Sequence, residues 1–190
     1  MVMKIALVGH SFVRDLESHG SPLALAHDFA FFWKPGSCFD FWSRYPRQLQ
    51  LCVNFAPDII YVILGSNSIV DSIPLCETKQ NAKELYRLLR EELPGASIVQ
   101  CEIEDRYLSV VNYKGTPPHV EFHKLRRSLN KHLGSNRAID SFCNIGGPGR
   151  LDNENFYKSD KIHLNASGLS CYWDCLGSHI DFIISKLNLQ

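Results

Sequence analysis

The chain has 190 residues, of which 45% are hydrophobic and 21% are charged, and its 20 basic residues balance its 20 acidic ones. This composition is ordinary for a globular protein and excludes a disordered or fibrous chain. The length suits one folding unit, so we expect residues 1–190 to form a single domain. Because the net charge is zero, the overall field does not attract nucleic acid, and such binding would need a local basic patch.

The cysteines and the hydrophobic runs bear on the cellular compartment. Seven cysteines are an odd number and are scattered along the chain, without the dense spacing of a disulfide scaffold. We therefore expect free thiols in a reducing, intracellular and cytoplasmic setting. The apolar run at 1–8 is too short for a signal peptide and reads as a strand. No stretch approaches the roughly 20 apolar residues of a membrane span.

Strands and helices are expected to alternate along the chain. Apolar runs of strand length occur at 4–9, 29–33, 58–64 and 97–101, and a weaker one near 137–142. Amphipathic helical patterns occupy about 78–93, 118–133 and 166–187. Runs that are apolar on both faces indicate parallel strands covered by helices on both sides. The sequence predicts an α/β fold, a three-layer α/β/α sandwich around a mostly parallel five-stranded sheet.

Three features with chemical potential are expected at one edge of that sheet. Ser11 follows the first strand, Gly65-Ser66-Asn67 follows the third, and Asp160 and His163 precede the last helix. In open parallel sheets, ligands bind outside the carboxyl ends of the strands. A serine nucleophile needs a base within hydrogen-bond reach and a group that orients the base. One loop carrying both Asp160 and His163 can supply both.

With these features aligned, nearly the whole chain resembles the SGNH, or GDSL-like, hydrolase superfamily, whose markers are a Ser, a Gly, an Asn and a His in that order. The matching positions are Ser11 in Gly-His-Ser-Phe, Gly36 in Pro-Gly-Ser, Asn67 in Gly-Ser-Asn, and His163 in Asp-Lys-Ile-His-Leu-Asn. The last block is the most specific and Gly36 the least. The resemblance implies a flavodoxin-like arrangement of the sheet.

The resemblance also implies a mechanism. Ser11 would attack the acyl carbon, His163 would accept its proton, and Asp160 would orient His163. The oxyanion would be held by the backbone N–H groups of Ser11 and Gly36 and the side-chain amide of Asn67. We therefore expect a serine esterase or deacetylase that hydrolyses a small acyl ester without cofactor or metal. The sequence contains no readable code for the acyl group, the leaving group or the oligomeric state; the segments expected to decide specificity are loops at about 12–28, 36–46 and 104–118.

Two positions depart from the family pattern. His10 stands beside the nucleophile where common members have an acid, and Ser68 follows Asn67 where they often have an aspartate. Successive strand residues point to opposite faces, so His10 is badly aimed at Ser11. We expect His10 to brace or pack the first loop rather than act as the base.

Each candidate also has an ordinary structural interpretation. Alone, Ser11 and Asn67 would be a helix cap and a turn residue, Gly36 a loop glycine, and Asp160 with His163 an exposed loop pair. It is the joint occurrence of the blocks that favours catalysis.

Other candidate sites fit structural roles better. Cys171, Cys175 and His179 are spaced like metal ligands, but they flank an apolar stripe and lack a fourth partner, so no metal site is expected there. Asn165 is expected to cap the last helix. An aromatic group after Gly36 is expected in the core more than in an acyl pocket: Phe39, Phe41, Trp42 and Tyr45.

The alternative function is a binding module for RNA or protein with the same fold and little or no turnover. A small basic patch on the helix at 118–133 is compatible with it, although a solvated face is the default interpretation: Lys124, Arg127 and Lys131, with Arg126 and Arg137 nearby. The Gly-His-Ser-Phe variant also resembles SGNH modules in proteins encoded by animal transposable elements. An intact set of marker residues favours the enzyme.

Overall fold

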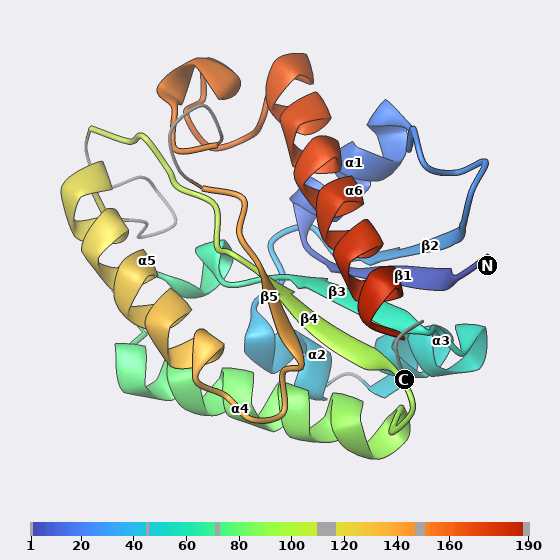
Figure 1. Cartoon of the computed structure of the whole chain (residues 1–190). Helices are drawn as coiled ribbons and strands as arrows, with labels where there is room; N and C mark the ends of the chain where they lie inside the picture. Colours follow the sequence, from blue (N-terminus) through green and yellow to red (C-terminus); the bar gives the residue numbers. More distant parts are fainter. Residues whose placement is uncertain (1, 45, 71–72, 110–116, 147–150, 188–190) are drawn as a thin grey trace.

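A parallel five-stranded sheet lies at the centre of the protein, with helices on both of its faces (Figure 1). The computed structural model describes residues 2–44, 46–70, 73–109, 117–146 and 151–187. The strand order is β2-β1-β3-β4-β5, and every pair is parallel. This arrangement confirms the α/β, flavodoxin-like sheet predicted from the sequence.

Strands and helices alternate along the chain, except that two helices lie between the second and third strands. The strands are β1 (Lys4–Gly9), β2 (Asp28–Trp33), β3 (Ile59–Ile63), β4 (Ser97–Cys101) and β5 (Ser141–Cys143). The helices are α1 (Ser11–His19), α2 (Phe39–Arg44), α3 (Pro46–Phe55), α4 (Leu75–Glu92), α5 (His119–Gly134) and α6 (Ala166–Leu187). Two short 3₁₀ turns are η1 (Ser66–Ser68) and η2 (Glu154–Phe156).

Alternate side chains of the central strands supply two separate cores. In β1, Ile5 and Leu7 pack on the side of α1 and α6, whereas Ala6 and Val8 pack on the side of α2, α3, α4 and α5. All five residues of β3 are buried. A strand buried on both faces needs no polar alternation, which explains the continuous apolar runs in the sequence.

The expected and observed elements differ mainly at the ends and in the expected loops. The strand expected near 137–142 is shorter and lies at Ser141–Cys143, and the helix expected at 78–93 begins earlier, at Leu75. Two of the expected specificity loops contain helices: α1 at the start of 12–28 and α2 within 36–46. Both helices are short, so their apolar periodicity is weak in the sequence.

Among the helices of the described residues, none combines the length and the apolar character that a membrane crossing requires.

Gly9, the last residue of β1, permits a close approach between β1 and β3. A Cβ at this position would collide with the carbonyl oxygen of Ile63 and would lie 2.7 Å from Val13 Cγ2. The first obstacle is backbone within the sheet, so relief would require the strands to move.

We therefore predict that Gly9→Ala lowers the free energy of unfolding by about 2–3 kcal/mol, as overpacking of a rigid core does. Urea unfolding followed by circular dichroism measures the change. Gly95→Ala is the matched control, because a Cβ there meets open space, and its effect should stay within about 0.5 kcal/mol. Equal effects of the two substitutions would contradict the proposed close approach.

Candidate active site

The carboxyl ends of β1, β2 and β3 bring three chain segments together. Ser11 begins α1 directly after β1, and η1 follows β3. The turn after β2 is tied to the end of β1 because Lys34 N and Ser37 Oγ both donate to the carbonyl oxygen of Gly9, at 3.0 and 3.3 Å. The turn that carries Gly36 therefore lies close to Ser11.

Ser11, His163 and Asp160 form a continuous hydrogen-bonded chain. Ser11 Oγ lies 3.2 Å from His163 Nε2, and His163 Nδ1 lies 2.7 Å from Asp160 Oδ2. The serine and histidine are 152 residues apart in the sequence. With the carboxylate accepting the Nδ1 proton, neutral His163 presents Nε2 to the serine hydroxyl as an acceptor.

The loop before α6 fixes the carboxylate on the histidine. Asp160 Oδ1 accepts the backbone N–H groups of Ile162 and His163, both at 2.9 Å, and Lys161 adopts a left-handed conformation with φ 58°. Partial burial opposes ionisation of Asp160, but the hydrogen bonds from His163 and Ile162 outweigh it and lower its pKa. Asp160 is thus held as a carboxylate that orients the imidazole.

Asn67 lies in η1 with its amide held from both sides. Its Nδ2 donates to the carbonyl oxygen of Ser37 at 3.3 Å, and its Oδ1 accepts from Arg106 Nη2 at 2.5 Å. The second bond requires the oxygen to face Arg106, so the amide nitrogen faces the turn that carries Gly36. Gly36 has φ 74°, a conformation that favours glycine.

Ser68 and Cys38 tie the same two segments together. Ser68 is buried, and its hydroxyl accepts the backbone N–H of Phe39 at 3.4 Å. Cys38 Sγ donates to the carbonyl oxygen of Asn67 at 3.1 Å, and burial raises the pKa of this thiol. Ser68, one of the two positions that depart from the pattern expected from the resemblance, therefore has a bracing contact of its own.

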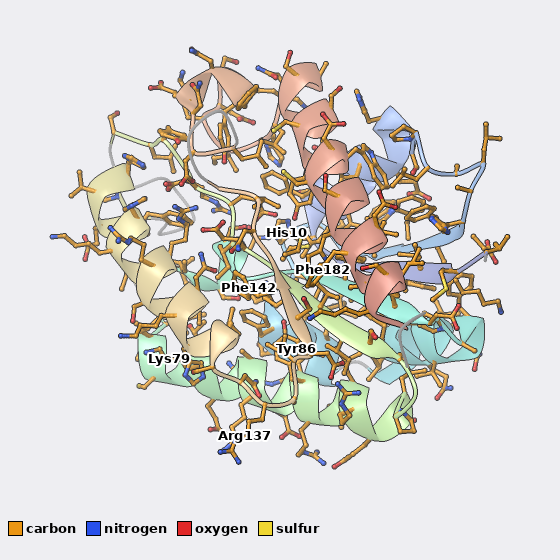
Figure 2. The ribbon with its side chains drawn as sticks, viewed as in Figure 1. His10, Lys79, Tyr86, Arg137, Phe142 and Phe182 are labelled. Atoms are coloured by element: carbon orange, nitrogen blue, oxygen red, sulfur yellow. The ribbon has the colours of Figure 1, made fainter. Side chains whose placement is uncertain are left out.

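His10 is fully buried in the interior (Figure 2), and its ring nitrogens face Phe12 N and Ser66 Oγ and not the Ser11 hydroxyl. Its Nδ1 accepts the backbone N–H of Phe12 at 3.4 Å, which makes it the N-cap of α1. Nε2 therefore carries the proton of the neutral ring and faces Ser66 Oγ at 3.0 Å. His10 thus links the first turn of α1 to η1, in agreement with the bracing role expected from the sequence.

Two ionisable side chains after β4 complete the buried surroundings of His10. Glu104 Oε2 lies 3.9 Å from His10 Nε2, and Glu104 Oε1 accepts from the Tyr172 hydroxyl at 3.2 Å. Burial raises the pKa of Glu104 to about 7 and lowers that of Arg106 to about 10. Burial, together with Arg106 and His163, lowers the pKa of His10 to about 3. His10 is therefore neutral and Arg106 charged near pH 7.

These braces were not identified from the sequence. Glu104 and Arg106 lie in an irregular segment after β4, and Arg106 meets Asn67 across 39 residues. The available signal was their place after the carboxyl end of a strand, where ligand sites of such sheets form.

The remaining sequence candidates fall outside the triad. Phe39 and Trp42 are fully buried in the core, as expected, whereas Tyr45 lies outside the described residues. His179 bonds Tyr61 and Ser141 with its two ring nitrogens, at 3.0 and 2.9 Å. It lines a cavity of about 450 Å³ between β5 and α6 that contains none of the triad residues.

Other sequence candidates have structural contacts. Asn165 Oδ1 accepts the backbone N–H of Gly168 at 3.0 Å and so caps α6, as expected. Arg126, expected near a basic patch, is buried and therefore does not contribute to such a surface. Its ion pairs with acidic side chains keep it inside.

Comparisons with known proteins show the same fold in esterases and acylhydrolases. No protein-family model matches the sequence, and no curated protein matches it. A carbohydrate esterase family 3 structure from Talaromyces cellulolyticus aligns with TM-score 0.71 at 14% identity, over 98% of this chain and 99% of that chain. The acetyl xylan esterase AlAXEase aligns with TM-score 0.69 at 12% identity, over 94% and 100%.

A third solved structure, the lipase/acylhydrolase from Enterococcus faecalis, aligns with TM-score 0.69 at 15% identity, over 94% of this chain and 95% of that chain. GDSL-like lipase structures are also among the matches. The chain therefore shares one fold, over nearly its whole length, with these esterase, acylhydrolase and GDSL-like lipase structures.

The buried neutral state of His10 predicts how stability depends on pH. Its folded pKa, about 3, lies below the unfolded value of 6.5. The folded state therefore binds fewer protons between these values, and His10 contributes stability above pH 6.5 that is lost as the pH falls towards 3. Protonation of Glu104 acts in the opposite direction, because its folded pKa is raised.

We predict that His10→Asn flattens the fall in unfolding free energy between pH 6.5 and 4, measured by urea unfolding at several pH values. Asparagine can still cap α1, so the helix start is retained. His19→Asn is the control, and its unfolding free energy should fall between pH 6.5 and 4 as steeply as that of the wild type. If the unfolding free energy of His10→Asn fell as steeply over this range as that of the wild type, the neutral buried state of His10 would be contradicted.

Proposed function

We propose that this protein is a serine esterase or deacetylase that hydrolyses small acyl esters. The observation that carries the proposal is the chain from Ser11 Oγ to His163 Nε2 at 3.2 Å and from His163 Nδ1 to Asp160 Oδ2 at 2.7 Å. The fold shared with esterases and acylhydrolases supports the same class of reaction.

In the proposed reaction, Ser11 Oγ attacks the acyl carbon while His163 takes the hydroxyl proton. Asp160 stabilises the imidazolium that forms, and His163 then gives the proton to the departing alkoxide. An acyl-enzyme on Ser11 remains. Water attacks this ester with His163 again acting as base, which releases the acid and restores the serine.

The proposed oxyanion hole consists of the N–H groups of Ser11 and Gly36 and the Nδ2 amide of Asn67. Arg106 is proposed as a positioning residue, because its bond to Asn67 Oδ1 sets which end of the amide faces the reacting oxygen. Preorganised donors of this kind stabilise the charge that develops in the transition state.

The exposure of the triad supports a small acyl group. The side chains of Asp160 and His163 are 45% and 30% exposed, and Ser11 is partly exposed. A short ester can reach Ser11 at such a surface, whereas a long acyl chain would need a deep apolar cavity for its burial. We therefore propose acetyl or similarly short acyl groups.

We predict that the wild type hydrolyses nitrophenyl acetate faster than esters of longer chains, and that Ser11→Ala and His163→Ala lower kcat by at least about 10³. A fluorophosphonate probe should label the wild type at Ser11, as shown by peptide mass spectrometry. Ser185→Ala is the matched control, since this exposed serine on α6 donates to Phe182 O of its own helix and is not part of the hydrogen-bonded chain, and it should retain full activity.

A folded wild type that neither turns over esters nor reacts with the probe would contradict the proposal. RNA affinity that depends on salt and persists in Ser11→Ala would then favour the binding module. The kinship with transposable-element modules, the single-domain organisation and the intracellular location stay predictions.

The positioning role of Arg106 gives a separate prediction. Asn67→Ala should lower kcat by about 10²–10³ with a small change in KM, as loss of one oxyanion donor does. Arg106→Lys keeps the charge but loses the planar fork, and we expect it to lower kcat by about tenfold.

The double variant separates positioning from general destabilisation. If Arg106 acts through Asn67, Arg106→Lys should have little further effect on kcat in an Asn67→Ala background. If Arg106→Lys lowered kcat by the same factor in the wild type and in Asn67→Ala, this role would be contradicted. Melting temperatures of all variants report whether folding is affected.

A further inference from the structure

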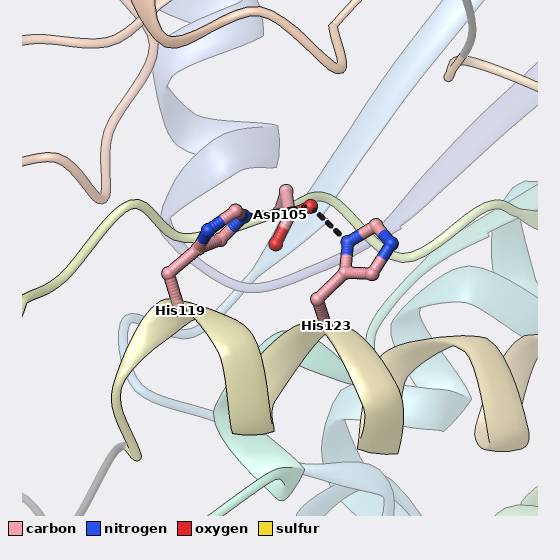
Figure 3. A group of neighbouring side chains, drawn as sticks. All are labelled: Asp105, His119 and His123. Atoms are coloured by element: carbon pink, nitrogen blue, oxygen red, sulfur yellow. Dashed lines mark hydrogen bonds and ion pairs between the residues drawn. The ribbon is translucent and has the colours of Figure 1, made fainter.

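A second group of titratable side chains lies outside the triad, between α5 and the segment after β4. His119 and His123 project from the first turns of α5 towards Asp105 (Figure 3). The histidines are four residues apart, so they share one face of the helix. Two histidines at this spacing on a helix can bind a single metal ion.

The donor atoms are close enough to share one ion. Asp105 Oδ2 lies 2.7 Å from His123 Nδ1 and 3.4 Å from His119 Nε2, and the three atoms lie within 4.8 Å of one another. Zinc bonds of about 2.0–2.2 Å in a tetrahedral site place donor atoms about 3.3–3.5 Å apart. The His119 distance already has this value, and the His123 distance needs to widen by about 0.7 Å.

One of the three donor atoms makes no hydrogen bond to any described residue. His119 Nε2 is buried and has no hydrogen-bond partner there, although it faces the Asp105 carboxylate. An unsatisfied buried nitrogen costs free energy. A metal ion at this position would give it a bond.

The surrounding residues hold the donors in place. Tyr107 stacks on the His119 ring with centroids 4.6 Å apart, and Asp105 is 2% exposed. Asp105 Oδ1 accepts the backbone N–H of Arg106 at 2.9 Å, which leaves Oδ2 to face the histidines. Such outer contacts orient metal ligands and raise affinity.

Arg126 is the natural competitor for the same oxygen. Its Nη2 lies 3.4 Å from Asp105 Oδ2 and 3.5 Å from His123 Nδ1. The guanidinium also bonds Asp152 at 3.1 Å and the carbonyl oxygen of Ile103 at 3.1 Å. Arg126 can therefore yield Oδ2 to a cation and remain paired, although its charge will reduce the affinity.

We propose that Asp105, His119 and His123 form a binding site for one divalent metal ion of the zinc type, with zinc as the preferred ion. Two imidazoles and one carboxylate suit zinc and similar borderline ions better than calcium or magnesium, which prefer oxygen ligands alone. Three protein ligands leave a fourth position for water. The site is separate from the triad, and it departs from the metal-free protein expected from the sequence.

Isothermal titration of zinc into protein first treated with a chelator tests the site. We expect one zinc ion per chain, and a loss of affinity of at least tenfold in His119→Ala and in His123→Ala. Cobalt titration should give visible bands of nitrogen and oxygen ligation without a thiolate charge-transfer band, which excludes binding through exposed Cys76. Zinc at about 100 times its Kd should raise the melting temperature by about 5 °C or more.

Two control variants locate the ion. His132→Ala removes a histidine from the same helix but outside the cluster, and it should bind zinc like the wild type. His163→Ala should also retain zinc, which excludes binding at the triad. Binding that persists in both His119→Ala and His123→Ala, or no stoichiometric binding at all, would overturn the proposal and leave the cluster as an ion-pair network around Asp105.

Discussion

The burial of β1 between β2 and β3 is the constraint on which the candidate site depends. β1 pairs with both neighbours, and Gly9 at its end lets the chain approach Ile63 before it turns into α1. The carbonyl oxygen of Gly9 then receives two hydrogen bonds from the turn after β2. Ser11, the proposed nucleophile, and the Gly36 turn are therefore both tied to the end of β1. Lys34 N donates one of the two hydrogen bonds and the buried side chain of Ser37 donates the other, so the turn is tied to the end of the sheet.

Behind this strand end lies His10, at the position where common members of the superfamily that the sequence resembles have an acid. His10 caps α1 with one nitrogen and contacts Ser66 with the other. A neutral imidazole can do both at once because it is donor and acceptor together, whereas a carboxylate only accepts. Arg106, which is charged near pH 7, and Glu104, whose pKa burial raises to about 7, share the same interior. A histidine at position 10 is thus compatible with a folded first loop. Its contacts explain how the loop is braced without an acid at this position.

The sequence was informative where one residue type repeats or where a motif is local. Continuous apolar runs identified β1, β3 and β4, and Asp160 with His163 lie on one short loop. It was uninformative for α2, whose six residues span fewer than two helical turns. It also missed Arg106, because its contact with Asn67 joins two irregular segments whose proximity only the folded sheet creates.

The segment after β4 serves both sites because its side chains alternate. Glu104 and Arg106 contact residues behind the triad, whereas Asp105 and Tyr107 contact the histidines of α5. An extended chain presents successive side chains to opposite sides. The two sites are joined directly through one bond, from Arg106 N to Asp105 Oδ1 at 2.9 Å. A cation that reorients the Asp105 carboxylate would therefore act on the same backbone unit whose side chain holds Asn67, which gives the proposed metal site a short physical route to the proposed oxyanion hole.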